Sequence, residues 1–386
     1  MTVGEDLMKL PDEILLDIAL RFAGRKRNKY LMNLALVDRR FRAIAREGLV
    51  RIGIVTLSGL PQYIELLAQH PHWAGHITRL ELGKHDWTTG WLGRWNMARL
   101  SAEALAACDD TIDRTWPLGE RERLKHDLRS HWDYTGICLC MLIGMLPNVK
   151  ELSVGTSSFQ MQFMMRLLNI RCHLHRRDES AESLGFQHVA NLLAEKLHVL
   201  KISRESPTGL HETESMFDTQ SLSKLKFLSI SGESLTPSRI AITSRLVKST
   251  LSPSLEHLRI FYDWKTFSLG WLKQLYNSRE CFNGLRVVQL YFRCTFEMFM
   301  QYVDVPVFKI EFLYFLEAWS KTAVSFETFF VLPGRPAEVE EPSNFGRHCL
   351  FAPLESLLRP RPPTDGYLFG RAAQRSNRTE EQRGLC

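Results

Sequence analysis

Cysteine and histidine side chains that could bind a metal ion occur together at one place in the chain. Cys172, His173 and His175 lie within four consecutive residues and carry the side chains that zinc prefers. A tetrahedral zinc site needs a second pair of ligands at a suitable spacing, and the neighbouring sequence supplies none. The polar end of a helix accounts for these residues more simply, so we expect no metal ion.

Catalytic motifs of the common enzyme classes are missing from the sequence. It has no Gly-x-x-x-x-Gly-Lys-Ser/Thr loop, no Gly-x-Gly-x-x-Gly turn, no Gly-x-Ser-x-Gly elbow and no His-Glu-x-x-His helix. These motifs bind nucleotides, activate a serine or hold a catalytic zinc ion. Their absence favours a binding protein without a cofactor, and an enzyme with an unfamiliar motif is the alternative.

Residues suited to binding another protein recur at intervals of thirty residues in the second half of the chain. They form three series, which are Phe227 and His257, then Ser229, Arg259 and Gln289, and then Phe261 and Tyr291. Aromatic and arginine side chains contribute most of the binding energy at many protein interfaces. We expect these residues to form a surface that binds a target protein; an ordinary solvated face is the alternative.

A six-residue pattern accounts for this spacing. Apolar residues occupy its first, fourth and sixth positions in Ile77-Leu80-Leu82, Val149-Leu152-Val154, Leu197-Leu200-Ile202, Leu225-Leu228-Ile230, Leu255-Leu258-Ile260 and Leu285-Val288-Leu290. The last three intervals are 28, 30 and 30 residues, close to the period of leucine-rich repeats, in which each repeat gives a strand and a helix. Leu49-Ile52-Ile54 and the weaker Val307-Ile310-Phe312 extend the series at its two ends.

The pattern also predicts which way the side chains face. Because side chains alternate across a strand, the apolar residues face the core and their neighbours, including the candidate binding residues, face the opposite, concave side. The earlier intervals of 72 and 48 residues are too long for one repeat and predict inserted helices. The asparagine that often follows a repeat strand is absent, so the repeats are degenerate.

Three short helices are predicted before the repeats. Leu10-Pro11-Asp12-Glu13 is typical of a helix start, because proline suits the first helical position and acids favour the first turn. A second helix is expected from about Lys29 to Val37, and Asp38 can cap a third that ends near Gly48. Helices this short cannot bury all of their apolar surface, so part of it packs on the next domain or binds a partner.

Two blocks of these helices resemble an F-box. Residues 10–18 read Leu-Pro-Asp-Glu-Ile-Leu-Leu-Asp-Ile, and residues 34–45 read Leu-Ala-Leu-Val-Asp-Arg-Arg-Phe-Arg-Ala-Ile-Ala. The F-box docks a substrate receptor onto the Skp-type adaptor of a cullin-RING ubiquitin ligase. The resemblance implies that the adaptor is contacted by Leu10, Pro11, Ile14, Leu15 and Leu36. A longer basic stretch between the first two helices departs from the family pattern.

The resemblance implies a substrate-recognition subunit of an SCF-type ligase. The F-box would bind the adaptor and, through it, cullin, and the repeats would bind an unknown target protein. An F-box scaffold or regulator that acts outside the ligase is the alternative.

The expected fold class is α/β, with a three-helix F-box followed by a leucine-rich-repeat-like horseshoe of short parallel strands and helices. Residues 1–9 are expected to be flexible, residues 10–48 to form the F-box, and residues 49–330 to form the repeat domain with helical insertions. From residue 331 to 386 the sequence is rich in proline and arginine and is expected to be largely disordered.

Composition and charge are those of an ordinary globular protein. Hydrophobic residues make up 45% and charged residues 24% of the 386 residues, and the net charge is +6, with 49 basic and 43 acidic residues interspersed. This balance does not predict nucleic-acid binding. No secretory signal is recognised and no apolar stretch is long enough to cross a membrane, so we expect a cytoplasmic or nuclear protein with reduced thiols.

Overall fold

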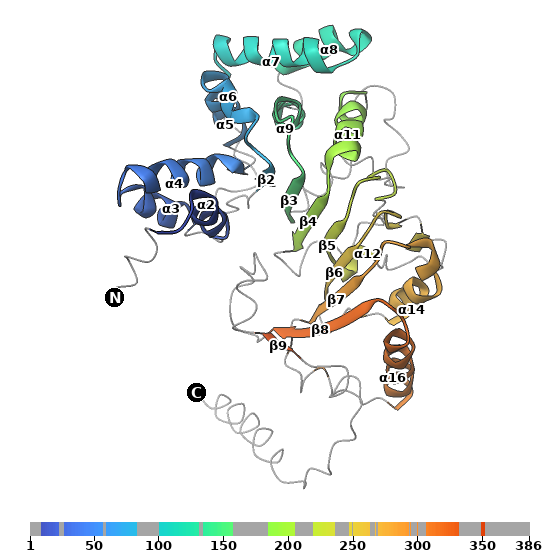
Figure 1. Ribbon diagram of the computed structural model, residues 1–386. Coiled ribbons are helices and arrows are strands. Elements are labelled where there is room, and N and C mark those ends of the chain that lie inside the picture. Colours follow the sequence, from blue (N-terminus) through green and yellow to red (C-terminus); the bar gives the residue numbers. More distant parts are fainter. Residues whose placement is uncertain are drawn as a thin grey trace, which may run out of the picture.

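The computed structural model describes residues 9–22, 27–56, 59–82, 100–130, 134–156, 184–204, 219–235, 247–248, 250–262, 267, 269–292, 294, 299, 306–331 and 349–351. These residues form an α/β fold in which three N-terminal helices precede a long parallel sheet (Figure 1). The predicted α/β class is therefore correct. The Cys172 group lies outside the described residues, as does most of the segment that was expected to be flexible at the N-terminus.

The sheet has nine strands, which lie side by side in chain order. The parallel strands are β1 (Ile52–Val55), β2 (Arg79–Leu82), β3 (Glu151–Thr156), β4 (Val199–Arg204), β5 (Phe227–Ser231), β6 (His257–Tyr262), β7 (Val287–Phe292) and β8 (Ser325–Val331). Strand β9 (Cys349–Phe351) pairs antiparallel with β8. Because neighbouring strands are parallel, the chain must return from the end of one strand to the side of the sheet where the next strand begins. The helices between the strands provide these connections.

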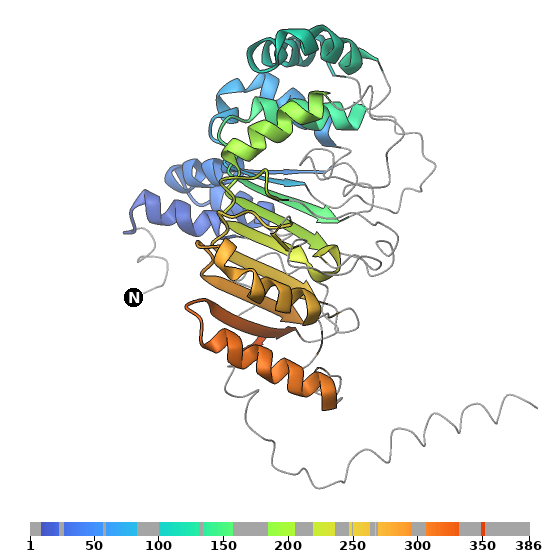
Figure 2. The same ribbon diagram turned by 90° about the vertical axis from the view of Figure 1, so that its right-hand side faces the viewer.

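Helices fill most of the connections between strands. They are α5 (Leu60–Gln69), α6 (Pro71–Ala74), α7 (Ala102–Thr115), α8 (Leu118–Arg129), α9 (Tyr134–Met145), α11 (Leu184–Lys196), α12 (Gly232–Leu235), α14 (Leu269–Asn277), the 3-10 helix η3 (Arg279–Cys281) and α16 (Pro306–Ser320). Figure 2 shows the strands stacked as a ladder, with the lime-green α11 and the orange α14 and α16 in front of them. The predicted insertions between β2 and β3 are helical, since α7, α8 and α9 lie there.

The apolar pattern forms the core between the sheet and these helices. One row of side chains in register crosses six neighbouring strands and is completely buried: Leu80, Leu152, Leu200, Leu228, Leu258 and Val288. Helix side chains such as Leu139, Leu193 and Leu272 belong to the same buried cluster. For β2 to β7 the six-residue pattern therefore predicted both the strands and the face that each strand buries.

The first strand has a register one residue away from the predicted one. The spacing Leu49-Ile52-Ile54 places Ile52 and Ile54 beside Leu80 and Leu82, but Gly53 pairs with Leu80 and Val55 with Leu82. Val55 is consequently buried, and Ile54 is 39% exposed on the other face. The small Gly53 leaves room for the ring of Tyr63, whose hydroxyl lies 2.6 Å from where a β-carbon would stand.

The last predicted segment of the series is helical. Val307, Ile310 and Phe312 lie in α16, and the strand that continues the sheet is β8. The position of β8 that matches the fourth place of the pattern is Phe326, sixteen residues after Ile310. In β8 the positions that pair with Val288 and Leu290 are Phe326 and Thr328. A threonine in a buried position hid this strand from the apolar pattern.

The N-terminal helices α2 (Asp12–Leu20), α3 (Arg27–Ala35) and α4 (Arg39–Arg51) form a module with its own core. The core contains Leu15, Ala19, Leu31, Phe41, Ile44 and Ala45 and is separate from that of the sheet. Asp38 caps α4 as predicted, since its carboxylate accepts a hydrogen bond from the Phe41 amide at 2.8 Å. Gly48 does not end α4; it is buried within this helix, next to Ala19 and Leu31.

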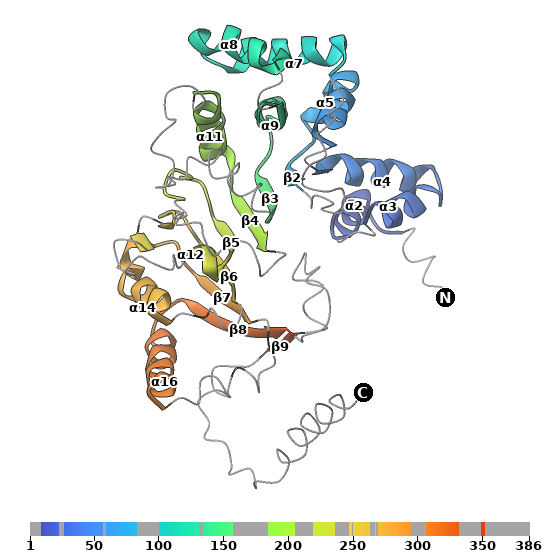
Figure 3. The same ribbon diagram turned by 180° about the vertical axis from the view of Figure 1, so that it is seen from behind.

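Helix α4 continues directly into the sheet. It ends at Arg51, and β1 begins at the next residue. The Thr78 amide donates a hydrogen bond to the Arg51 carbonyl at 3.1 Å, and the Arg46 guanidinium lies 5.6 Å from the centre of the Trp73 ring. Figure 3 shows the module beside β2, at the opposite end of the sheet from α16.

Two further predictions concern the C-terminal segment and the thiols. Residues 349–351 form β9, so part of the segment expected to be largely disordered is a strand of the sheet. Cys108, Cys138, Cys140, Cys281 and Cys294 are free thiols, and burial raises the pKa of Cys108 to about 12.

None of the described helices is long and apolar enough to span a bilayer.

Candidate binding surfaces

The first candidate surface lies on the three-helix module. Six of the nine large apolar side chains that are exposed in the described part of the chain belong to it: Ile14, Ile18, Tyr30, Met32, Leu36 and Val37. We refer to these six residues as the module surface. They lie on α2, on α3 and in the turn between α3 and α4. Large exposed apolar residues concentrated on one small unit are typical of an interaction site.

Four of the five predicted adaptor contacts are accessible. Leu36 is 78% exposed, Ile14 is 48% exposed, Pro11 is exposed and Leu10 is half-buried. Leu15 is buried in the core of the module, so the prediction that it reaches a partner is corrected. It is on the inward face of α2 with Ala19, one turn later, while Ile14 and Ile18 share the outward face.

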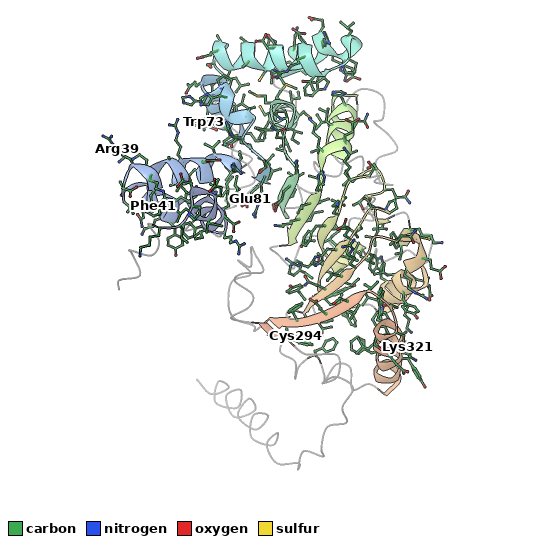
Figure 4. The ribbon with its side chains drawn as sticks, in the orientation of Figure 1. Arg39, Phe41, Trp73, Glu81, Cys294 and Lys321 are labelled. Atoms are coloured by element: carbon green, nitrogen blue, oxygen red, sulfur yellow. The ribbon has the colours of Figure 1, made fainter. Side chains whose placement is uncertain are left out.

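Polar contacts hold α2 against α4 and so position this surface. Arg40 on α4 forms an ion pair with Asp12 at 2.6 Å and also donates to the Leu10 carbonyl. At the opposite end the buried Arg27 donates to the Gly48 carbonyl at 2.5 Å, which joins α3 to α4. The side chain of Phe41 lies inside the module in Figure 4. The exposed residues are therefore presented by a packed unit.

The second candidate surface is the face of the sheet opposite the apolar core, which we call the inner face. Its middle row is polar and runs in register across seven strands: Glu81, Ser153, Lys201, Ser229, Arg259, Gln289 and Glu327. Aromatic residues flank this row on both sides from β5 onward, namely Phe227 and His257 on one side and Phe261, Tyr291 and Phe329 on the other.

Ion pairs neutralise the inner face at the β2 end. Arg79 contacts Glu81 at 2.6 Å and Glu151 at 3.3 Å, and Lys201 contacts Glu151 at 2.6 Å. Glu81 is labelled on β2 in Figure 4. The charges at this end are thus largely matched within the sheet.

Arg259 is at the centre of the aromatic part. Its guanidinium carbon lies 5.1 Å from the centre of the Phe227 ring and 5.2 Å from that of Tyr291. Its Nε donates to Gln289 Oε1 at 3.1 Å, and Gln289 Nε2 donates to Glu327 Oε2 at 2.7 Å. The side chain is only 7% exposed. A planar cation held between two rings in this way is stabilised by cation–π attraction.

The surrounding rings also contact one another. The ring centres of Phe227 and His257 are 4.7 Å apart, those of Phe261 and Tyr291 are 5.1 Å apart, and those of Tyr291 and Phe329 are 4.5 Å apart and stacked. Phe227, His257 and Phe261 are only partly buried, so the cluster opens to the surface.

All seven predicted target-binding residues lie on the inner face of β5, β6 and β7, and the structure brings them together. Three of them are largely buried, although we expected them to be accessible to a target: Ser229, Arg259 and Tyr291 are 6%, 7% and 2% exposed. Glu327 and Phe329 belong to the same cluster and were missed, because β8 itself was not recognised. The thirty-residue spacing could not find them, since the interval from β7 to β8 is 38 residues.

Burial lowers the pKa of His257, and the positive charge of Arg259 lowers it further, while Gln289 and Glu327 oppose this change. Nε2 of His257 is buried without a hydrogen-bond partner among the described residues. Burial also lowers the pKa of Arg259, although an arginine stays charged at any physiological pH. The cluster therefore holds a neutral imidazole beside a cation.

A pH dependence of stability follows from the lowered pKa of His257. In the unfolded chain a histidine titrates near ~6.5, so below that pH the unfolded state binds a proton that the folded state resists. The free energy of unfolding should fall as the pH is lowered from about 7.5 to about 5.5. In His257→Gln it should fall less over the same range, measured as urea midpoints at both pH values. Equal losses in the two proteins would contradict this assignment.

No group of three or more histidine, cysteine, aspartate or glutamate side chains in the described part of the chain is arranged to hold a metal ion. No protein-family model matches the chain, and no curated protein matches it either.

Proposed function

We propose that this protein is a substrate-recognition subunit of an SCF-type ubiquitin ligase. In this proposal α2, α3 and α4 are an F-box that binds a Skp-type adaptor and, through it, cullin. The parallel strands and their helices are a degenerate leucine-rich-repeat horseshoe whose concave side is the inner face. The protein carries out no chemistry itself.

The observation that carries the proposal is the module surface. A unit of three short helices has its own core and still leaves Ile14, Leu36 and four further large apolar residues exposed. Leaving apolar side chains in water costs roughly 1.5–3 kcal/mol each relative to burial, so a partner that covers them gains affinity. The order and spacing of the Leu-Pro-x-Glu-Ile-Leu and Leu-Val-x-Arg-Arg-Phe-Arg blocks, with Leu10 and Phe41 in place, favour a Skp-type adaptor as that partner.

The inner face is proposed as the site for the target protein. It combines exposed edges of aromatic rings with polar groups, and aromatic and arginine side chains are the types enriched at binding hot spots. It lies on the sheet rather than on the module, so adaptor and target need not compete.

Reconstitution tests the proposal and separates it from its alternative. The purified chain is mixed with a Skp-type adaptor and with cullin, and complexes are separated by size. A ternary complex supports a ligase subunit, whereas an adaptor complex that excludes cullin supports a scaffold or regulator outside the ligase. No binding of the adaptor refutes both readings.

A further inference from the structure

Arg259 has hydrogen-bonding capacity that the protein leaves unused. Its Nε donates to Gln289, but none of the described residues accepts a hydrogen bond from Nη1 or Nη2. Arg259 is only 7% exposed, but Nη1 and Nη2 are not among the fully buried atoms that lack a partner in the described part of the chain. Both donors therefore reach the surface, where a ligand can accept hydrogen bonds from them.

The other described cations of the inner face differ from Arg259 in this respect. Arg79 is paired with Glu81 and Glu151, and Lys201 is paired with Glu151. The carboxylate nearest to Arg259 in the polar row is that of Glu327, and its two oxygens accept hydrogen bonds from Gln289 and Ser325 instead. Among the described residues, Arg259 therefore has no carboxylate in direct contact, although the charge of Glu327 raises its pKa through space.

We infer that Arg259 is the receptor for a carboxylate of the target, with a neighbouring apolar side chain of the target lying on the rings around it. The inference rests on the proposed function of the inner face. The planar guanidinium can donate two parallel hydrogen bonds from Nη1 and Nη2 to the two oxygens of a carboxylate. Its contacts with Phe227 and Tyr291 and its hydrogen bond to Gln289 already hold the guanidinium in place, which lowers the entropy lost on binding.

The charges around Arg259 favour a singly charged carboxylate over a phosphate. Glu327 is connected to Arg259 through one glutamine, and His257 is neutral because its pKa is lowered. Recognition of a phosphorylated residue generally uses a cluster of arginines. Among the described residues of the inner face, no second unpaired cation is near enough to supply such a cluster, since Lys201 is engaged by Glu151.

The test is a selection of random heptapeptides displayed on phage, with the full-length chain as bait. Wild-type protein should enrich peptides that carry aspartate or glutamate at one fixed position beside an aromatic or large aliphatic residue. In synthetic copies, replacing that acid by its amide should weaken binding at least about tenfold, because the charge-assisted pair is lost. Copies with free and amidated C-termini distinguish a side chain from a chain terminus as the source of the carboxylate.

Two substitutions of the protein supply the matched comparison. Arg259→Met keeps an unbranched aliphatic stem and removes the guanidinium and its charge, so it should lose the preference for the acid. Arg279→Met should keep it, because Arg279 stacks on Tyr276 at 4.3 Å beside α14, outside the inner face. Should Arg259→Met fail to fold, the comparison of acid and amide peptides on wild-type protein still decides the question.

Three results would overturn the inference: no enriched acidic position, equal affinity for acid and amide peptides, or retention of the preference in a folded Arg259→Met. A phosphoserine peptide that binds about tenfold more tightly than the glutamate peptide would overturn the choice of a carboxylate. Adaptor binding is measured on the same preparations. Intact adaptor binding without an acid preference refutes only this inference, and the reverse result refutes only the proposed function.

Discussion

Replacing Ile14 and Leu36 together by aspartate should abolish adaptor binding and leave the fold unchanged. Both side chains are exposed, at 48% and 78%, so the folded monomer loses little when they become polar. In the complex, two buried apolar side chains at roughly 1.5–3 kcal/mol each correspond to a loss of about a hundredfold or more in affinity. The two added carboxylates increase the loss. Titration of the adaptor by calorimetry measures it, and circular dichroism reports on the fold.

Leu118→Asp is the matched control. Leu118 is 81% exposed at the start of α8, away from the module, and its substitution should change neither adaptor binding nor stability. An adaptor that binds the Ile14→Asp/Leu36→Asp protein normally would show that the module surface serves another purpose.

Leu258→Asp should unfold the sheet domain. Leu258 is completely buried in the central strand β6, in register with Leu228 and Val288. A carboxylate placed there has no partner, and the lost apolar contacts add to its desolvation, for about 4 kcal/mol or more in total. This is a large part of the roughly 5–15 kcal/mol by which proteins are stable. Loss of the cooperative urea transition is the expected observation.

Ile54→Asp tests whether an aspartate is tolerated on the exposed face of a strand, in contrast to the buried face tested by Leu258→Asp. The spacing of apolar residues places Ile54 in the core, but the sheet pairs it with Glu81 on the inner face, where it is 39% exposed. We expect little change in the urea midpoint for this variant and a large decrease for Val55→Asp on the same strand. A large decrease for Ile54→Asp with little change for Val55→Asp would show that Ile54, and not Val55, faces the core, as the spacing of apolar residues predicts.

The sequence was most informative where one face of a strand is wholly apolar. Leu80, Leu228 and Leu258 repeat with constant spacing because each must pack on the same helical layer, and that requirement is visible in the pattern. The alternation of side chains then predicted that Arg259 and Gln289 lie together on the inner face. Strand pairing decides this geometry, so it does not depend on the irregular connections between the strands.

The predictions from the apolar pattern are wrong where another packing requirement decides which residue is buried. At β1, Gly53 takes the core position beside Leu80 because the ring of Tyr63 occupies the space of a side chain. At β8, Thr328 is buried at a position where the earlier strands have leucine, isoleucine or valine. In the module, the pattern identifies the apolar residues of α2 but does not distinguish Leu15, which is buried in the same core as Ile44 and Phe41, from the exposed Ile14.

The direct junction between α4 and β1 has a consequence for how the two surfaces work together. Arg51 ends the helix, Ile52 begins the strand, and the Arg46–Trp73 contact and the Thr78 amide brace the junction from the side. Because no linker separates the module from the sheet, the distance and angle between the module surface and the inner face are fixed. If the protein is the ligase subunit that we propose, a target bound to the inner face would be held at one distance from the adaptor. The shape of this molecule would then decide which lysines of the target are modified.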